Sequence, residues 1–199
     1  MTEFIIVPGI GGSGKAHWQT HWQQASPAMR RFSPASWDAP DFDDWVAALE
    51  TAVCQAWTPP VLVAHSLGCL LVVHWQRISP RSIGGALLVA VPDPASSAFP
   101  SSARAFADAP QQRLRFPSLI VASTNDPYGS LDYVRAKSER WGSDLHIAGP
   151  LGHINGDSGL GDWPVGMELL TAFLGRTKQA PEPPCFSRDR NGTATAPPS

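Results

Sequence analysis

The chain of 199 residues has few cysteines, little charge and no long hydrophobic run. Its three cysteines are an odd number without CxxC or CxxH spacing, which argues against a disulfide framework and a structural zinc site. Lys and Arg number 15 against 17 Asp and Glu, so a net charge of -2 leaves no basic surface for nucleic acid or anionic lipid. No segment approaches the roughly 20 apolar residues of a membrane span. We therefore expect a small-molecule partner, with no nucleic acid, no membrane and a reducing compartment.

The N-terminal segment also lacks the features of a secretory signal. No basic stretch precedes its apolar run, and that run is short because it ends at Pro8. We interpret it as a first strand. Together with the cysteine usage, this predicts a cytoplasmic protein.

Short aliphatic runs recur along the chain, each closed by Gly, Pro, Ser or Asn, as is typical of strands buried on both faces of a parallel sheet. They lie at 4–7, 61–64, 86–91, 119–122 and, more weakly, 145–148, and 29–33 is a further candidate. Helical patterns separate them at 16–24, 44–57, 67–78, 131–141 and 165–174. Asp43 or Asp44 is expected to cap the second helix and Ser130 the fourth. This alternation predicts an α/β sandwich with a mostly parallel sheet, helices on both faces and ligands at the carboxyl ends of the strands.

The length and a hydrophobic content of 43% favour one domain with a sizeable core. After Gly175 the composition becomes polar and rich in proline, with almost nothing to bury. We therefore predict a single domain over residues 1–175 and a disordered tail over 176–199.

A strand pattern runs directly into a serine and then into an apolar helix pattern in the segment Val61-Leu-Val-Ala-His-Ser-Leu-Gly-Cys-Leu-Leu. This order is typical of the nucleophile elbow, a tight turn that holds a serine at its apex with the hydroxyl exposed. Two backbones come close there, which requires small residues, here Ala64 and Gly68. The usual motif is GxSxG, so Ala64 departs from it by one methyl group. We predict Ser66 as the nucleophile and His65 as a packing or hydrogen-bonding histidine.

A nucleophilic serine needs a base, and the base needs an acid that holds its tautomer. In α/β-hydrolases the acid and then the base follow the serine along the chain. His153 lies on a glycine-rich loop after the last strand, whereas His146 lies inside that strand pattern. Asp126 follows the strand at 119–122, and Asp93, in a proline-rich turn after the preceding strand, is the alternative. By chain order and position we predict Asp126 as the acid and His153 as the base.

Acyl transfer also requires two backbone N–H groups aimed at the charge that develops on the carbonyl oxygen. Leu67, directly after the serine, is expected to supply one of them. The loop Pro8-Gly-Ile-Gly-Gly is expected to supply the other, because its glycines let the backbone turn toward the site. Ile10 is the predicted donor, and Gly11 remains open as an alternative. This chemistry needs no cofactor and no metal.

Four segments go beyond these generic motifs. They are a VPGxGG loop followed by a HW helix at 7–18, the AHSLG elbow, STNDPY at 123–128, and GHINGDSGLGDWPVG at 152–166. Together they resemble the small serine hydrolases of α/β-hydrolase fold that are grouped with the retinoblastoma-binding protein nine and its bacterial relatives. The resemblance covers nearly the whole chain to about residue 175. It implies the triad Ser66, Asp126 and His153 and an esterase-like activity, but little about the natural substrate.

The glycine-rich loop from Gly9 to Lys15 admits another interpretation. It satisfies the GxGxxG fingerprint of dinucleotide-binding proteins, with Asp38 or Asp41 in the neighbourhood that holds a ribose. It also matches a phosphate loop, except that Ala16 stands where a hydroxyl would bind magnesium. Nucleotide binding therefore stays an alternative, although it does not account for the Ser, Asp and His motifs. A non-catalytic interaction module is a second alternative, but a scaffold has no need of all three residues.

His17 and His21 have the i, i+4 spacing of metal ligands, but no third ligand is evident nearby. We expect both to be exposed helix histidines and predict no metal site.

The chain offers no insertion large enough for a cap over the site. Apart from an early segment, the only long connection is 92–116, rich in Ala, Ser and Pro, with a short helix expected near 102–107. The predicted site is therefore shallow, bordered by this segment and by 156–163, with Trp163 offering apolar contact. Esters with about two to six acyl carbons should then be better substrates than longer ones.

Overall fold

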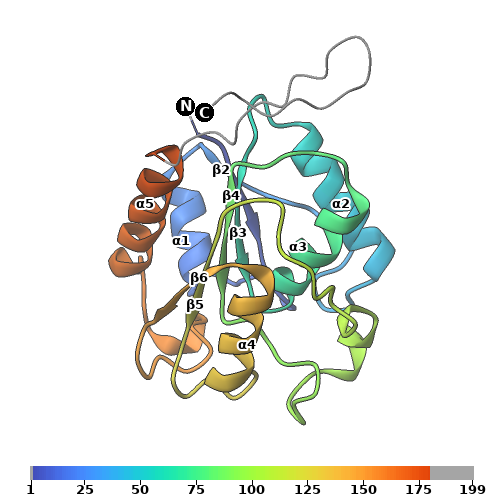
Figure 1. Cartoon of the computed structure of the whole chain (residues 1–199), viewed down its shortest axis with the longest axis vertical. Helices are drawn as coiled ribbons and strands as arrows, with labels where there is room; N and C mark the ends of the chain where they lie inside the picture. The colour runs from blue at the N-terminus through green and yellow to red at the C-terminus, as the bar shows by residue number, and fades with distance from the viewer. Residues whose placement is uncertain (1, 180–199) are drawn as a thin grey trace, which may run out of the picture.

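A six-stranded sheet forms the centre of the computed structural model, which describes residues 2–179 (Figure 1). The strands lie in the order β2-β1-β3-β4-β5-β6, and every neighbouring pair is parallel. Their bounds are β1 (Phe4–Val7), β2 (Met29–Arg31), β3 (Val61–His65), β4 (Gly85–Val89), β5 (Ser118–Ala122) and β6 (Asp144–Ile147). Each strand predicted from an apolar run is present, including the additional short one.

Helices cover both faces of this sheet (Figure 1). The α-helices of the described residues are α1 (Trp18–Ala25), α2 (Phe42–Cys54), α3 (Leu67–Ile78), α4 (Leu131–Trp141) and α5 (Pro164–Gln179). α1 and α5 pack on one face, and α2, α3 and α4 pack on the other. Two short 3₁₀ helices, η1 (Ser101–Phe106) and η2 (Gly156–Ser158), lie in loops. The predicted α/β sandwich is confirmed, and no large cap is evident within residues 2–179.

Alternation along the strands separates two apolar layers. In β1, Ile5 and Val7 belong to the same cluster as Trp45 of α2, whereas Ile6 belongs to the cluster of Trp18 in α1. Strands β3, β4 and β5 are buried along their whole length because both of their faces are covered, which explains their continuous aliphatic runs. Since all strands are parallel, the loops that follow them gather at one edge of the sheet.

Two helix ends differ from the predictions. α2 is capped by Asp41 and not by Asp43 or Asp44, because the Asp41 side chain accepts the N–H of Asp44 at 2.9 Å. α5 continues to Gln179, past the predicted domain end at residue 175. The remainder of the predicted tail, 180–199, lies outside the described residues. Ser130 caps α4 as predicted.

Cys54 and Cys69 are free thiols, while Cys185 lies outside the described part of the chain. Within residues 2–179, no helix combines the length and the apolar character needed to cross a membrane.

Candidate active site

Ser66 lies at the turn between β3 and α3 with φ 53° and ψ -125°, a conformation that a non-glycine residue rarely adopts. Its N–H donates to the carbonyl of Val89 in β4 at 3.0 Å, which holds the turn against the sheet. The small residues around it are explained by close approaches. A Cβ on Gly68 would collide with the carbonyl oxygen of Val7, and a Cβ on Gly9 would lie 2.9 Å from Ser66 Cβ. The geometry is that of a strained turn presenting a hydroxyl.

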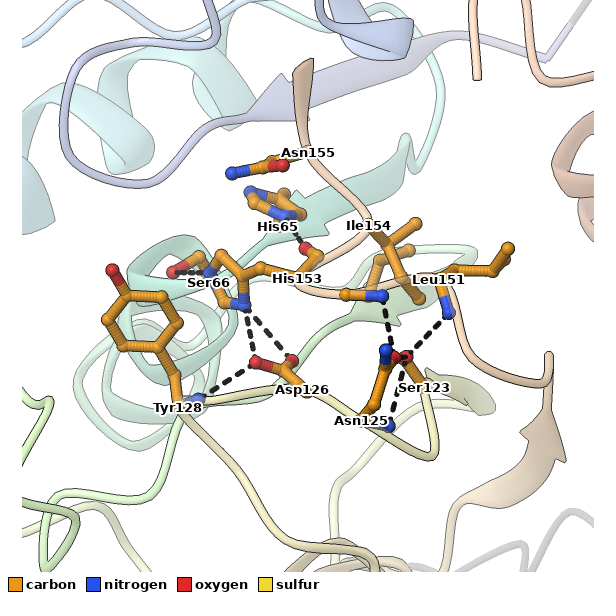
Figure 2. A network of polar contacts seen from close by, with 12 residues as sticks. His65, Ser66, Ser123, Asn125, Asp126, Tyr128, Leu151, His153, Ile154 and Asn155 are labelled. Atoms are coloured by element: carbon orange, nitrogen blue, oxygen red, sulfur yellow. Dashed lines mark hydrogen bonds and ion pairs between the residues drawn. The ribbon is translucent and has the colours of Figure 1, made fainter. Parts of the chain in front are cut away.

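His153 lies between Ser66 and Asp126 and hydrogen-bonds to both (Figure 2). Its Nε2 is 2.9 Å from Ser66 Oγ, and its Nδ1 is 2.9 and 3.0 Å from the two carboxylate oxygens of Asp126. Because the Asp126 carboxylate can only accept, the ring proton of His153 is on Nδ1. The unprotonated Nε2 can then accept the hydroxyl proton of Ser66. The Asp126 side chain is only 3% exposed, and it also accepts the N–H of Tyr128 at 2.9 Å. The three residues predicted from separate motifs are therefore in direct contact.

The segment before His153 is anchored to the loop that follows β5. Leu151 N–H donates to Ser123 Oγ at 2.9 Å, and Gly152 N–H donates to Asn125 Oδ1 at 2.7 Å (Figure 2). The loop that carries Asp126 therefore also holds the backbone directly before His153. Sequence analysis assigned no role to Asn125, although its place directly before the predicted acid was a signal.

Two further hydrogen bonds hold His153 and the residue after it. His65 Nε2 donates to the His153 carbonyl at 2.9 Å, and Trp18 Nε1 donates to the Ile154 carbonyl at 2.8 Å. His65 is thus a hydrogen-bonding histidine, as predicted. Trp18, missed by the sequence analysis, ties the same loop to α1, and the HW pair in the sequence was the only trace of that contact.

Burial keeps both His65 and His17 neutral. Burial, reinforced by the neighbouring His153, lowers the pKa of His65 well below its ordinary value. Burial, reinforced by Arg31, lowers the pKa of His17 to about 3. The expectation of an exposed His17 was wrong, because its ring lies against His65 with centroids 4.6 Å apart and its Nδ1 caps α1. His21 instead pairs with a different side chain, Asp162, at 2.8 Å.

The candidate oxyanion amides are distinguished by their partners. Gly11 N–H donates to the carbonyl of Trp37 at 3.0 Å, so it is already engaged. Among the described residues, no acceptor pairs with the N–H of Ile10 or of Leu67, and both residues line the cavity beside Ser66. The absent side chain of Gly9 lets this loop approach the turn.

A cavity of about 310 Å³ opens over Ser66. Its apolar wall comes from the connection between β4 and β5 and includes Phe99 and Pro100, just before η1, and Ala103 within η1. The predicted border by 92–116 is therefore present, whereas the predicted border by 156–163 was wrong, because no residue of that segment lines the cavity. Trp163 was placed wrongly: it is 4% exposed, does not line this cavity and packs on Trp18.

The alternative site residues lie elsewhere in the architecture. Asp93 Oδ1 accepts the N–H of Ala95 at 2.9 Å and so caps a turn, and His146 lies within β6. In the glycine-rich loop, the carbonyls of Gly12 and Ser13 accept hydrogen bonds from Arg31. A phosphate cradle presents N–H groups to its ligand, so this loop gives the nucleotide interpretation no support.

Comparison with known proteins gives one family and several similar structures. A family model described as serine hydrolase matches residues 4–172. A YdeN-like hydrolase from Pectobacterium atrosepticum is 30% identical, with a TM-score of 0.79 over 89% of this chain and 92% of that one. The ydeN gene product of B. subtilis is 18% identical, with a TM-score of 0.70 over 88% and 100%. An esterase domain from Rhodothermus marinus is 16% identical, with a TM-score of 0.66 over 88% and 87%. No curated protein matches the chain.

Proposed function

Because the chain belongs to the serine hydrolase family, we propose that it hydrolyses esters of small acyl groups, with Ser66 as nucleophile, His153 as base and Asp126 as acid. The observation that carries this proposal is the continuous hydrogen-bonded chain from Ser66 Oγ through His153 to the Asp126 carboxylate. That arrangement activates a hydroxyl that is a weak nucleophile by itself.

In the first half of the reaction, Ser66 Oγ forms a bond to the acyl carbon while its proton passes to His153 Nε2. The amides of Ile10 and Leu67 stabilise the negative charge that develops on the carbonyl oxygen. The bond from the acyl carbon to the leaving oxygen then breaks, and His153 returns the proton to that oxygen. An alcohol leaves, and the acyl group stays on Ser66.

Water completes the cycle by the same steps. His153 accepts a proton from water as the water oxygen attacks the acyl carbon, and it then returns the proton to Ser66 Oγ. The acid product departs and the hydroxyl is restored. Asp126 orients the imidazole and stabilises its positive charge in both halves, and every proton is accounted for without a cofactor.

The cavity supports a preference for short acyl groups. Its volume of about 310 Å³ is at the lower end of the range for ligand pockets, and the short η1 segment forms its apolar wall. A longer chain would extend into solvent and gain no further burial, at ~0.8 kcal/mol per methylene. We therefore expect kcat/KM to stop rising beyond about six acyl carbons.

A labelled fluorophosphonate and a panel of p-nitrophenyl esters from acetate to dodecanoate test the proposal together. Wild type should be labelled and should hydrolyse the short esters. Ser66→Ala should lose labelling and retain less than roughly a thousandth of the rate, with the fold unchanged by circular dichroism. Absence of both labelling and turnover in wild type would favour the non-catalytic module, and protection by nucleotides in a melting assay would favour nucleotide binding. A kcat/KM that still rises at ten or twelve carbons would contradict the short acyl site.

A further inference from the structure

The cavity over Ser66 has an apolar side and a polar side. Phe99, Pro100 and Ala103 line one part of it, whereas His65 and Asn155 line the part next to His153. None of the lining residues is Lys, Arg, Asp or Glu. If Ser66 acts as proposed above, His153 must hand its proton to the leaving oxygen, so the leaving group lies on the polar side.

Asn155 presents a hydrogen-bond donor to this polar side. Its Oδ1 accepts the N–H of Asp157 at 3.1 Å and the hydroxyl of Ser158 at 3.4 Å, as the N-cap of η2. These contacts determine the orientation of the amide, because only the oxygen can accept a backbone N–H. The Nδ2 group is directed the other way, and no described residue accepts a hydrogen bond from it.

His65 presents a hydrogen-bond acceptor beside that donor. Its Nε2 donates to the His153 carbonyl, and the ring is neutral because burial lowers its pKa. A neutral imidazole with the proton on Nε2 has an unprotonated Nδ1 that accepts. No described residue donates to this nitrogen. Both residues line the same cavity, and Figure 2 shows the second nitrogen of His65 and the amide nitrogen of Asn155 directed to the same side.

We propose that Asn155 Nδ2 and His65 Nδ1 form a polar subsite for the leaving group, selecting esters whose alcohol carries a second neutral group that both donates and accepts. A hydroxyl or a carboxamide meets this requirement, since it accepts from Asn155 and donates to His65. A charged group does not, because the cavity lining offers no counter-ion and an unpaired charge is costly to bury. The subsite gives the proposed esterase a substrate class: short acyl esters of diols, of larger polyols or of hydroxyamides.

Matched esters test the subsite directly. 2-Hydroxyethyl butyrate and propyl butyrate differ by a hydroxyl in place of a methyl group, and carbamoylmethyl butyrate replaces the hydroxyl by a carboxamide. Wild type should favour the hydroxyl ester, the carboxamide ester or both over propyl butyrate by at least about tenfold in kcat/KM, followed by pH-stat titration. Which of the two is favoured identifies the group that the subsite holds. Butyrylcholine, with a cationic leaving group, should show no such advantage.

Asn155→Ser tests the Nδ2 donor of Asn155 separately from the role of its side chain as the cap of η2. Serine caps a helix well but is too short to reach the cavity, so the preference should fall to within about threefold while the turn is kept. Asp157→Asn, in the same turn and outside this cavity, is the matched control and should keep the full preference.

Equal rates on the polar and apolar esters in wild type, or an unchanged preference in Asn155→Ser, would overturn the subsite. In that case propyl butyrate and the fluorophosphonate would still react at Ser66, so the proposed hydrolase would stand. If no ester is hydrolysed and Ser66 is not labelled, the hydrolase and the subsite fail together.

Discussion

Ser66 and His153 are in hydrogen-bond contact, but the protein holds them in different ways. Ser66 lies between a strand and a helix that adjoin it in the sequence, and its place is determined by backbone geometry and by the absence of side chains at Gly9 and Gly68. His153 lies on a loop, where the surrounding backbone is held by four side chains from other parts of the chain: Ser123, Asn125, His65 and Trp18.

The difference indicates where each half of the site is vulnerable. A strained turn is stable only when the elements on both sides pack closely, so a side chain added at Gly9 or Gly68 should affect the fold. A loop held by individual hydrogen bonds can be loosened one bond at a time, so changes around the base should affect turnover more than stability.

The largest effect on the base side is expected from Asp126→Asn. The amide cannot hold the tautomer that leaves His153 Nε2 free, and kcat for p-nitrophenyl butyrate should fall by about 10⁴-fold with little loss of fold. Asp93→Asn is the matched control and should be mild, since Asp93 only caps a turn. A larger loss in the Asp93 variant than in the Asp126 variant would reverse the assignment of the acid.

On the nucleophile side, Gly68→Ala should destabilise the whole domain. Its new Cβ meets the backbone of Val7 in β1, which cannot move without disturbing the sheet, so a loss of about 3 kcal/mol in the free energy of unfolding is expected. Urea unfolding measures it. Gly175→Ala, at an exposed position of α5 where a Cβ meets nothing, should instead stabilise the protein by up to about 1 kcal/mol. Similar stabilities for the two variants would contradict the close approach.

A smaller effect is expected when one anchor of the base is removed. His65→Phe loses the bond to the His153 carbonyl. With p-nitrophenyl butyrate, whose leaving group has no donor for the proposed polar subsite, kcat should fall by about 10- to 100-fold while KM changes little, because His153 is displaced and the apolar side of the cavity remains. His65→Gln keeps a donor and should recover part of the rate. If Gln gives no rescue, or if KM rises instead of kcat falling, His65 does not act by positioning His153.

A further effect concerns acid stability. The pKa of His17 is about 3 in the folded protein and about 6.5 when the side chain is exposed. Between pH 6.5 and pH 3, His17 is therefore protonated in the unfolded chain and neutral in the folded protein. Stability is therefore complete above pH 6.5 and is lost toward pH 3, by up to about 1.4 kcal/mol per pH unit from this residue. His65 contributes in the same direction.

His17→Asn isolates this contribution, because asparagine keeps the cap on α1 and does not titrate. Urea unfolding at pH 7 and pH 4.5 should show a smaller loss for the variant than for wild type. Identical losses of unfolding free energy in the two proteins would mean that protonation of His17 does not destabilise the folded state.

Most of the architecture was predictable from local pattern. The strands were found from aliphatic runs and the sandwich from their alternation with helices, because a strand covered on both faces must be apolar along its length. Ser66 was found for a related reason: a strand, a small residue, a serine and a helix leave a signature within a dozen positions. The error at the start of α2, where Asp43 or Asp44 was predicted as the cap and Asp41 is the cap, arose because three aspartates within four positions are equally suited to cap.

The sequence by itself determined the parallel sheet, the turn at Ser66 and the candidate base and acid, since each depends on neighbours a few positions away. Only the tertiary structure decided which backbone N–H beside the site is free. Gly11 N–H donates to the Trp37 carbonyl, whereas Ile10 N–H has no acceptor among the described residues. It also decided that His17 and Trp163 are buried. These outcomes rest on contacts between elements far apart in the chain, and a hydrogen bond between distant residues leaves no periodicity or spacing in the sequence from which it can be inferred.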